Sequence, residues 1–115
     1  MAQPGCRYAA GVSVRVRGDI ARCVDLGHKS IAAENTIDKR VYFLNTDNLQ
    51  FLSQSEEHLI LKVEEAAAYK IGDVLYGVPF HICPTVALYE RAVVVEKNEA
   101  VDEWKVIARD RKISV

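Results

Sequence analysis

His81 and Cys83 are the residues whose types and spacing could do chemistry in this chain. They lie two positions apart in residues 79–85, a segment that the sequence predicts to be extended. Because successive side chains of a strand point to opposite faces, this spacing would place the imidazole and the thiol side by side. Histidine and cysteine are the commonest zinc ligands by residue type. The pair therefore predicts a metal site, while spacing alone leaves open that Cys83 is a small buried hydrophobe.

The rest of the chain offers little to complete a catalytic site. Pro79 and Pro84 flank the pair, which predicts a strand end or an edge strand. His58 and Asp25 are the other candidates, and His58 fits best as a polar strand end. There is no glycine-rich phosphate loop and no serine nucleophile elbow. Two protein ligands are fewer than the three typical of catalytic zinc, so water, substrate or another part of a larger protein would fill the remaining positions.

Composition bounds the class of protein. The 115 residues are 50% hydrophobic and 27% charged, which is typical of one soluble globular domain. The net charge of −1 predicts neither a nucleic acid nor an anionic membrane as partner. The basic residues Arg15, Arg17 and Arg22 alternate with apolar ones, as on a solvated strand face. No apolar run approaches the ~20 residues of a membrane span. Three irregularly spaced cysteines and no signal sequence predict a reducing cytoplasm.

The hydrophobic pattern predicts an all-β fold, a sandwich or small partly closed barrel of about eight short strands. Residues 25–30 indicate a hydrogen-bonded corner around Gly27. Trp104 and Tyr89 are expected to supply bulk to the core. The predicted strands cover residues 8–17 and 20–26 as one hairpin, 40–45 with 49–53 as its returning strand, 59–63, 74–78, and 91–96 with 100–108 as a final hairpin; helical turns are expected within 64–69 and 84–89.

Five short motifs together carry a resemblance. They are Asp25-x-Gly27-x-Lys29-Ser30, Ser55-Glu56-Glu57-His58, Gly72-Asp73, Pro79-x-His81-x-Cys83-Pro84-Thr85-Val86 and Val106-x-Ala108-Arg109-Asp110-Arg111. In this order they resemble the C-terminal domain of the D-threonine aldolase and D-serine dehydratase family, which are alanine racemase-like, fold-type III pyridoxal-phosphate enzymes. The resemblance runs from Tyr8 to the end of the chain. It predicts a C-terminal β domain over residues 8–115, with residues 1–7 disordered or foreign to the natural protein.

The resemblance implies a division of labour between two domains. An N-terminal (β/α)₈ barrel, absent from these 115 residues, would carry pyridoxal phosphate and its Schiff-base lysine, so Lys29 is not that lysine. The β domain would supply metal ligands over the cofactor. The dehydratase branch uses His-x-Cys with zinc, which His81 and Cys83 match, whereas the aldolase branch uses His-x-Asp. The metal would hold the β-hydroxyl of a D-3-hydroxy amino acid, with pyridoxal phosphate as electron sink. The parent enzyme is expected to be a homodimer.

Three functions follow as hypotheses. The first is the metal-ligand domain of such a lyase, inactive as an isolated chain, with no catalytic or cofactor-binding residue of its own. The second is a stand-alone β-barrel module that binds a metal or small ligand. The third is a structural or dimerisation domain with His81 and Cys83 in its core. The choice between aldol cleavage, dehydration and racemisation depends on groups in the barrel.

Overall fold

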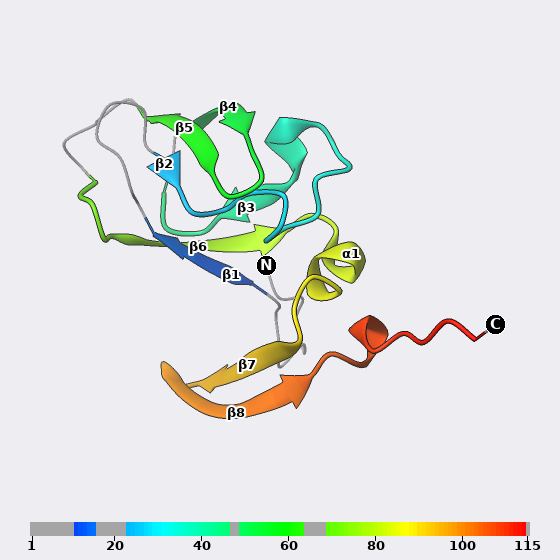
Figure 1. The fold of residues 1–115 in the computed structure, drawn as a ribbon. Helices are drawn as coiled ribbons and strands as arrows, with labels where there is room; N and C mark the ends of the chain where they lie inside the picture. Colours follow the sequence, from blue (N-terminus) through cyan, green and yellow to red (C-terminus); the bar gives the residue numbers. More distant parts are fainter. Residues whose placement is uncertain (1–10, 16–22, 47–48, 64–68, 115) are drawn as a thin grey trace.

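A computed structural model describes residues 11–15, 23–46, 49–63 and 69–114. The strands are β1 (Val12–Arg15), β2 (Cys23–Val24), β3 (Val41–Phe43), β4 (Leu49–Gln54), β5 (Leu59–Val63), β6 (Val74–Pro79), β7 (Arg91–Glu96) and β8 (Glu99–Lys105). The helical elements are α1 (Ile82–Val86) and the 3-10 turns η1 (Ile37–Lys39) and η3 (Ile107–Arg109) (Figure 1). The predicted all-β class is confirmed. In this part of the chain no helix is long and apolar enough to cross a membrane.

The described strands form three separate antiparallel sheets. One has the order β1-β6-β3, the second β2-β5-β4, and the third is the β7-β8 hairpin. Two predicted pairings are therefore wrong: β1 pairs with β6 and β2 with β5, while β3 pairs with β6 and β4 with β5. Turn residues in the sequence indicate only that the chain reverses direction, and not which strands pair with each other. Partner choice depends on which faces bury together, so β1 and β2, and likewise β3 and β4, lie in different sheets although they are neighbours in sequence.

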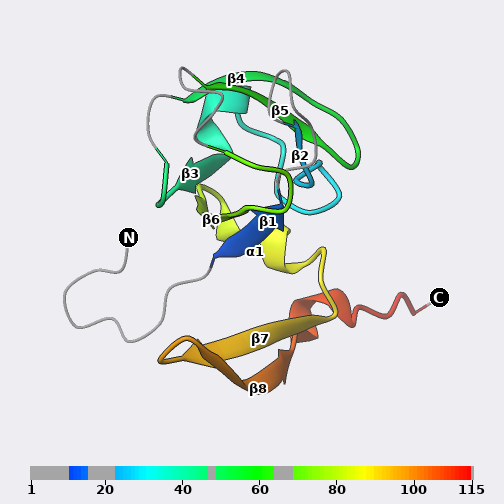
Figure 2. The same cartoon turned by 90° about the vertical axis from the view of Figure 1, so that its left-hand side faces the viewer.

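One hydrophobic core joins the first two sheets. Val41, Phe43 and Leu75 enter it from the β1-β6-β3 sheet, and Leu59 and Leu61 from β5 in the other. The remaining buried members are Val24, Leu26 and Ile31. Each such side chain contributes about 1.5–3 kcal/mol when it is fully removed from water. Figures 1 and 2 show the two sheets stacked, so the body of the domain is a two-layer sandwich.

Gly77 lets the central strand β6 lie close to β3. A Cβ atom at this position would lie 2.5 Å from Cγ2 of Val41 and 3.4 Å from the ring of Phe43. The space that a side chain at position 77 would need is thus occupied by two core residues of the neighbouring strand. This packing fixes the end of β6, from which the chain runs to His81.

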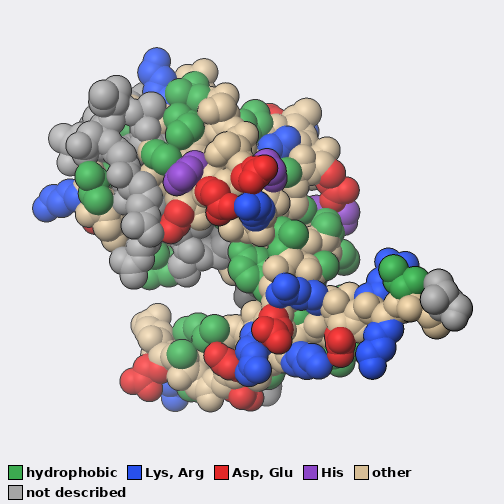
Figure 3. Space-filling model, viewed as in Figure 1, with side chains coloured by type: hydrophobic (Ala, Val, Ile, Leu, Met, Phe, Trp, Pro, Cys, Tyr) green, Lys and Arg blue, Asp and Glu red, His purple; other side chains and the backbone are tan. Residues whose placement is uncertain are grey.

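The β7-β8 hairpin stands apart from the sandwich (Figures 2 and 3). The predicted hairpin is confirmed, and its turn has positive φ at Lys97 (49°) and Asn98 (64°). The predicted end of its second strand at residue 108 is wrong, since β8 ends at Lys105 and residues 107–109 form η3. Of its strand residues only Val94 is partly buried. Trp104 is 50% exposed and Tyr89 38%, so the prediction that they supply core bulk is wrong. Their size favours burial, but the hairpin that carries Trp104 packs on neither sheet.

Several expectations fall on residues outside the described ranges. These are the expectation that residues 1–7 are disordered or foreign, most of the helical turn predicted within 64–69, and residues 8–10 and 16–22 of the first predicted hairpin, which include its turn. Of the basic residues of that hairpin, Arg17 and Arg22 also lie outside.

A pair of identical substitutions tests the position of the core. Leu61→Ala should lower the free energy of unfolding by about 2–5 kcal/mol, because it leaves a cavity among fully buried side chains. Leu52→Ala, on the same sheet but 45% exposed, should cost about 0.5 kcal/mol. Urea titration followed by circular dichroism measures both. Equal losses would contradict the core described here.

Candidate functional site

His81 and Cys83 lie at the beginning of a short helix and not on a strand. β6 ends at Pro79, His81 is extended (φ −122°, ψ 97°) as the N-cap of α1, and Cys83 is the helix's second residue. The prediction of a strand across residues 79–85 is therefore wrong beyond Pro79. The physical reason is that Pro84 fits the first turn of a helix, where its missing N–H is not needed. Both side chains are exposed, on one turn of chain and not on one strand face.

Thr85 fastens this turn to the rest of the domain. Its hydroxyl donates to the carbonyl oxygen of His81 at 2.8 Å and accepts from the backbone N–H of Ala32 at 3.0 Å. Thr85 is only 2% exposed. Nearby, the Tyr89 hydroxyl donates to the carbonyl oxygen of Ser30 at 2.6 Å, and burial raises the pKa of this hydroxyl. The segment from Ser30 to Ala32 is thereby bound at two points, to Thr85 within α1 and to Tyr89 just after it.

This attachment brings Glu34 to His81. The Glu34 carboxylate Oε1 contacts Nδ1 of the His81 ring, with both side chains about half exposed. Sequence reasoning missed Glu34, because it belongs to none of the recognised motifs and lies far from His81 along the chain. No local pattern signals such a contact; only the docking of the 30–34 segment on α1 creates it.

The two described cysteines differ in accessibility. Cys83 is exposed and Cys23 is partly buried, and neither forms a disulfide. The pKa of the Cys23 thiol is raised, mainly by burial and further by the charge of Asp25. Cys83 is therefore the more accessible thiol of the two.

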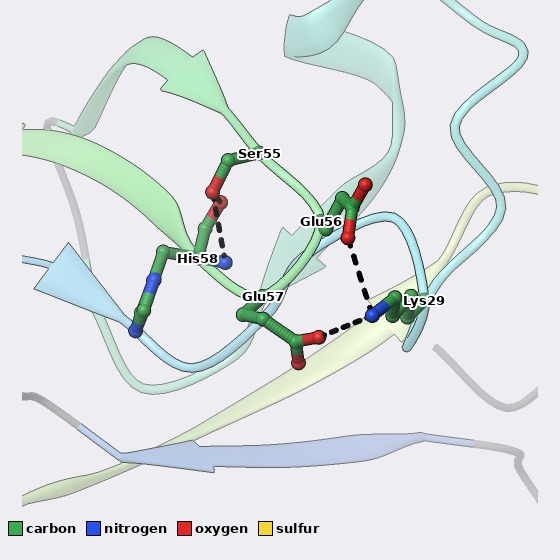
Figure 4. Close-up of polar contacts among 5 residues, drawn as sticks. All are labelled: Lys29, Ser55, Glu56, Glu57 and His58. Carbon is green, nitrogen blue, oxygen red and sulfur yellow. Dashed lines mark hydrogen bonds and ion pairs between the residues drawn. The ribbon is translucent and has the colours of Figure 1, made fainter.

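The predicted corner at residues 25–30 docks on the β4-β5 turn (Figure 4). The N–H of His28 donates to the Ser55 carbonyl at 3.0 Å, and that of Lys29 to the Glu56 carbonyl at 3.2 Å. A Cβ at Gly27 would lie 1.9 Å from the Glu56 carbonyl oxygen, which only glycine permits. Two of the five recognised motifs thus meet, and their role here is structural.

Charged side chains close over the same corner. Lys29 Nζ lies 2.7 Å from Glu57 Oε1 and 3.2 Å from Glu56 Oε2. Hydrogen bonds to these carboxylates raise the pKa of Lys29, and Lys29 lowers that of Glu57. His58 is exposed and its N–H donates to Ser55 Oγ at 3.3 Å, so it closes the turn just before β5, as expected of a polar strand end.

The donor set fits half of a zinc site. An exposed imidazole and an exposed thiol are suitable nitrogen and sulfur ligands. Within the described ranges, however, no three histidine, cysteine or carboxylate side chains gather closely enough to hold a metal ion. Two protein ligands are fewer than a zinc site uses. Metal binding by His81 and Cys83 stays a prediction.

The chain is similar to a known family, to a curated protein and to solved structures, one of which is described below. Residues 8–95 match the family described as Putative serine dehydratase domain. A D-threonine aldolase from Arthrobacter sp is 37% identical over 62 residues, which are 53% of this chain and 16% of the aldolase. The crystal structure of an alanine racemase-like protein from Idiomarina loihiensis superimposes with a TM-score of 0.68 at 18% identity, covering 83% of this chain and 30% of that protein. This last likeness shows the fold alone. The chain thus spans less than a third of either protein's length.

The docking of the corner predicts a strong effect of one methyl group. Gly27→Ala should lower the free energy of unfolding by about 2–4 kcal/mol, because the added Cβ forces the two backbone hydrogen bonds of the corner apart. Lys29→Ala is the control: it removes only exposed ion pairs and should move the urea midpoint far less. A Gly27→Ala variant as stable as the parent chain would show that the corner does not lie against the β4-β5 turn.

Proposed function

Because the chain belongs to the serine dehydratase domain family, we propose that it is the C-terminal β domain of a larger, pyridoxal-phosphate-dependent lyase acting on D-3-hydroxy amino acids. In this proposal His81 and Cys83 supply two ligands to a divalent metal ion, zinc in the first instance. The observation that carries it is the exposure of both side chains on one turn fastened by the buried Thr85. The likeness to a D-threonine aldolase and to an alanine racemase-like protein supports the wider assignment.

The role of this chain in the proposal is to bind the metal ion at its surface, where a substrate can reach it. The thiolate of Cys83 would neutralise part of its charge, the imidazole of His81 would donate a lone pair, and water or substrate would complete the coordination. Bound there, the metal would act as a Lewis acid on a substrate hydroxyl. The bond that is then broken depends on groups that the proposal places elsewhere in the parent enzyme.

Pyridoxal phosphate is assigned to the parent's barrel and not to this chain. An imine-forming lysine needs a neutral amine, whereas the carboxylates of Glu56 and Glu57 raise the pKa of Lys29 and keep it protonated. Lys29 therefore does not fit the cofactor. The isolated chain is accordingly expected to be inactive. The parent is proposed to be a cytoplasmic homodimer.

A stand-alone small-ligand module is the second candidate, favoured by one groove. A hollow of about 220 Å³ lies beside β3 and β4 and is lined by aromatic and apolar side chains with one carboxylate. Tyr42, Phe43, Phe51, Phe80 and Asp38 contribute to it. Binding of a small molecule there by the 115-residue chain alone would favour this alternative.

Zinc affinity tests the proposed ligands. The chain should bind zinc weakly, and His81→Ala and Cys83→Ala should each weaken binding at least about tenfold, because each removes one of two protein ligands. Cys23→Ala is the matched control, since it removes a partly buried thiol and should leave the affinity unchanged. Competition against a chromophoric chelator measures the affinity, and cobalt(II) spectra report thiolate ligation. Unaltered binding in both ligand variants would overturn the metal role.

The size of the natural gene product tests the parent enzyme. Antibody raised to this domain should detect a band several times heavier than 12.9 kDa in an extract of the source cells. Pyridoxal phosphate and zinc should then be found on that larger protein. A band at 12.9 kDa alone would contradict the lyase domain and favour the stand-alone module.

A further inference from the structure

We propose that Glu34 positions His81 for metal binding by accepting a hydrogen bond from the Nδ1–H of its ring. The observation is the contact between Glu34 Oε1 and His81 Nδ1. The inference rests on the metal role proposed above and extends it to a residue outside the recognised motifs. Glu34 is a positioning residue here, because it acts on the metal only through the ring of His81.

The chemistry of imidazole gives this contact its meaning. A neutral histidine ring carries one proton, on either Nδ1 or Nε2, and the other nitrogen keeps a lone pair. An acceptor placed at Nδ1 selects the Nδ1–H form and leaves Nε2 free as a ligand. It also fixes the rotation of the ring and increases the basicity of Nε2. Metal-binding histidines almost always donate their other N–H to a carboxylate, a carbonyl or water for these reasons.

The backbone on both sides of Glu34 is tied to the fold. Before it, the N–H of Ala32 is bound by the buried Thr85 hydroxyl. After it, the carbonyl oxygen of Asn35 accepts from Arg40 Nε at 2.8 Å, and Asn35 Nδ2 donates to the carbonyl oxygen of Lys39 at 3.1 Å. The carboxylate therefore projects from a tied segment toward a ring whose own backbone is held by Thr85. A surface glutamate on an untethered loop would pay more side-chain and backbone entropy to make this contact.

Thr85 holds the backbone of His81 and, two residues before Glu34, that of Ala32. Its hydroxyl makes both hydrogen bonds at once. By contrast, Glu103 lies 3.3 Å from Arg91 across the exposed hairpin, as an ordinary surface ion pair. Exposed pairs of this kind contribute little to stability, and the Glu34–His81 pair is similarly exposed. Loss of the Glu34 carboxylate should therefore leave the fold intact and change only what His81 can do.

The test compares Glu34→Ala and Glu34→Gln with Glu103→Gln, a carboxylate of similar exposure, in the 115-residue chain. Long-range ¹H–¹⁵N spectra without metal, at about pH 8 where histidine is ordinarily neutral, report the tautomer of His81. His81→Ala assigns the signal. Zinc competition gives the affinity, and urea titration checks the fold.

We expect the Nδ1–H tautomer in the parent chain. Glu34→Ala should shift His81 toward the Nε2–H form and weaken zinc binding by up to about tenfold, and by less than His81→Ala does, because the ring itself remains as a ligand. Glu34→Gln should keep the tautomer, because its amide oxygen still accepts the hydrogen bond, and lose less affinity. Glu103→Gln should change neither quantity.

The failures of the two proposals are distinguishable. If His81→Ala and Cys83→Ala do not weaken zinc binding, the metal role fails. If they do, but Glu34→Ala keeps both the tautomer and the affinity of the parent chain, the positioning role is overturned and the metal site stands. A loss in Glu34→Ala as complete as that in His81→Ala would also overturn it, in favour of direct ligation by Glu34.

Discussion

The hydroxyl of Thr85 is the group on which the candidate site depends. It is buried, and a hydroxyl without partners in such a position costs about 1–3 kcal/mol. Here it has two, the carbonyl of His81 and the N–H of Ala32, which come from α1 and from the segment leading to Glu34. Because the cost of burial is offset only when both are in place, the two segments are held together. The backbone that carries the exposed side chains of the site is thus held in place.

The sandwich determines where the two segments joined by Thr85 lie. β6 is the central strand of its sheet, and its last residue, Pro79, pairs with Val41. The N–H of Phe80 then donates to the Arg40 carbonyl at 3.1 Å, so the chain leaves the sheet in a defined direction. On the other sheet, the missing side chain of Gly27 lets the chain pass the β4-β5 turn closely before it reaches Ser30. Both routes to the site are therefore fixed by backbone contacts and by close approaches at glycine.

Local patterns in the sequence predict those elements whose contacts are local. The apolar, β-branched runs of β5 and β6 and the tight β7-β8 hairpin could be recognised, and so could the corner at Gly27. The pairing of β1 with β6 could not, because it depends on which distant faces bury together. The beginning of α1 was missed because Pro84 suits both the end of a strand and the first turn of a helix.

The candidate site divides along the same line. His81 and Cys83 could be found because they are close in sequence and belong to a recognised motif. Glu34 could not, because its place beside His81 follows from two hydrogen bonds made by Thr85 and Tyr89 to a segment far away in the chain. Burial of Trp104 and Tyr89 was expected because large aromatic side chains favour a core. Their size does not tell whether the segment that carries each of them packs against the sandwich.

Two incomplete features of the domain have one explanation under the proposed function. His81 and Cys83 offer two ligands where a zinc site needs more, and the β7-β8 hairpin exposes Val93, Val95 and Trp104. A two-stranded hairpin is at best marginally stable without a packing partner. If the remaining ligands and the hairpin's cover both come from the rest of a parent enzyme, strong metal binding requires that the domains assemble. This chain alone would then bind the metal weakly because it supplies only two ligands. The metal would be held tightly only in the assembled enzyme, where the substrate reacts.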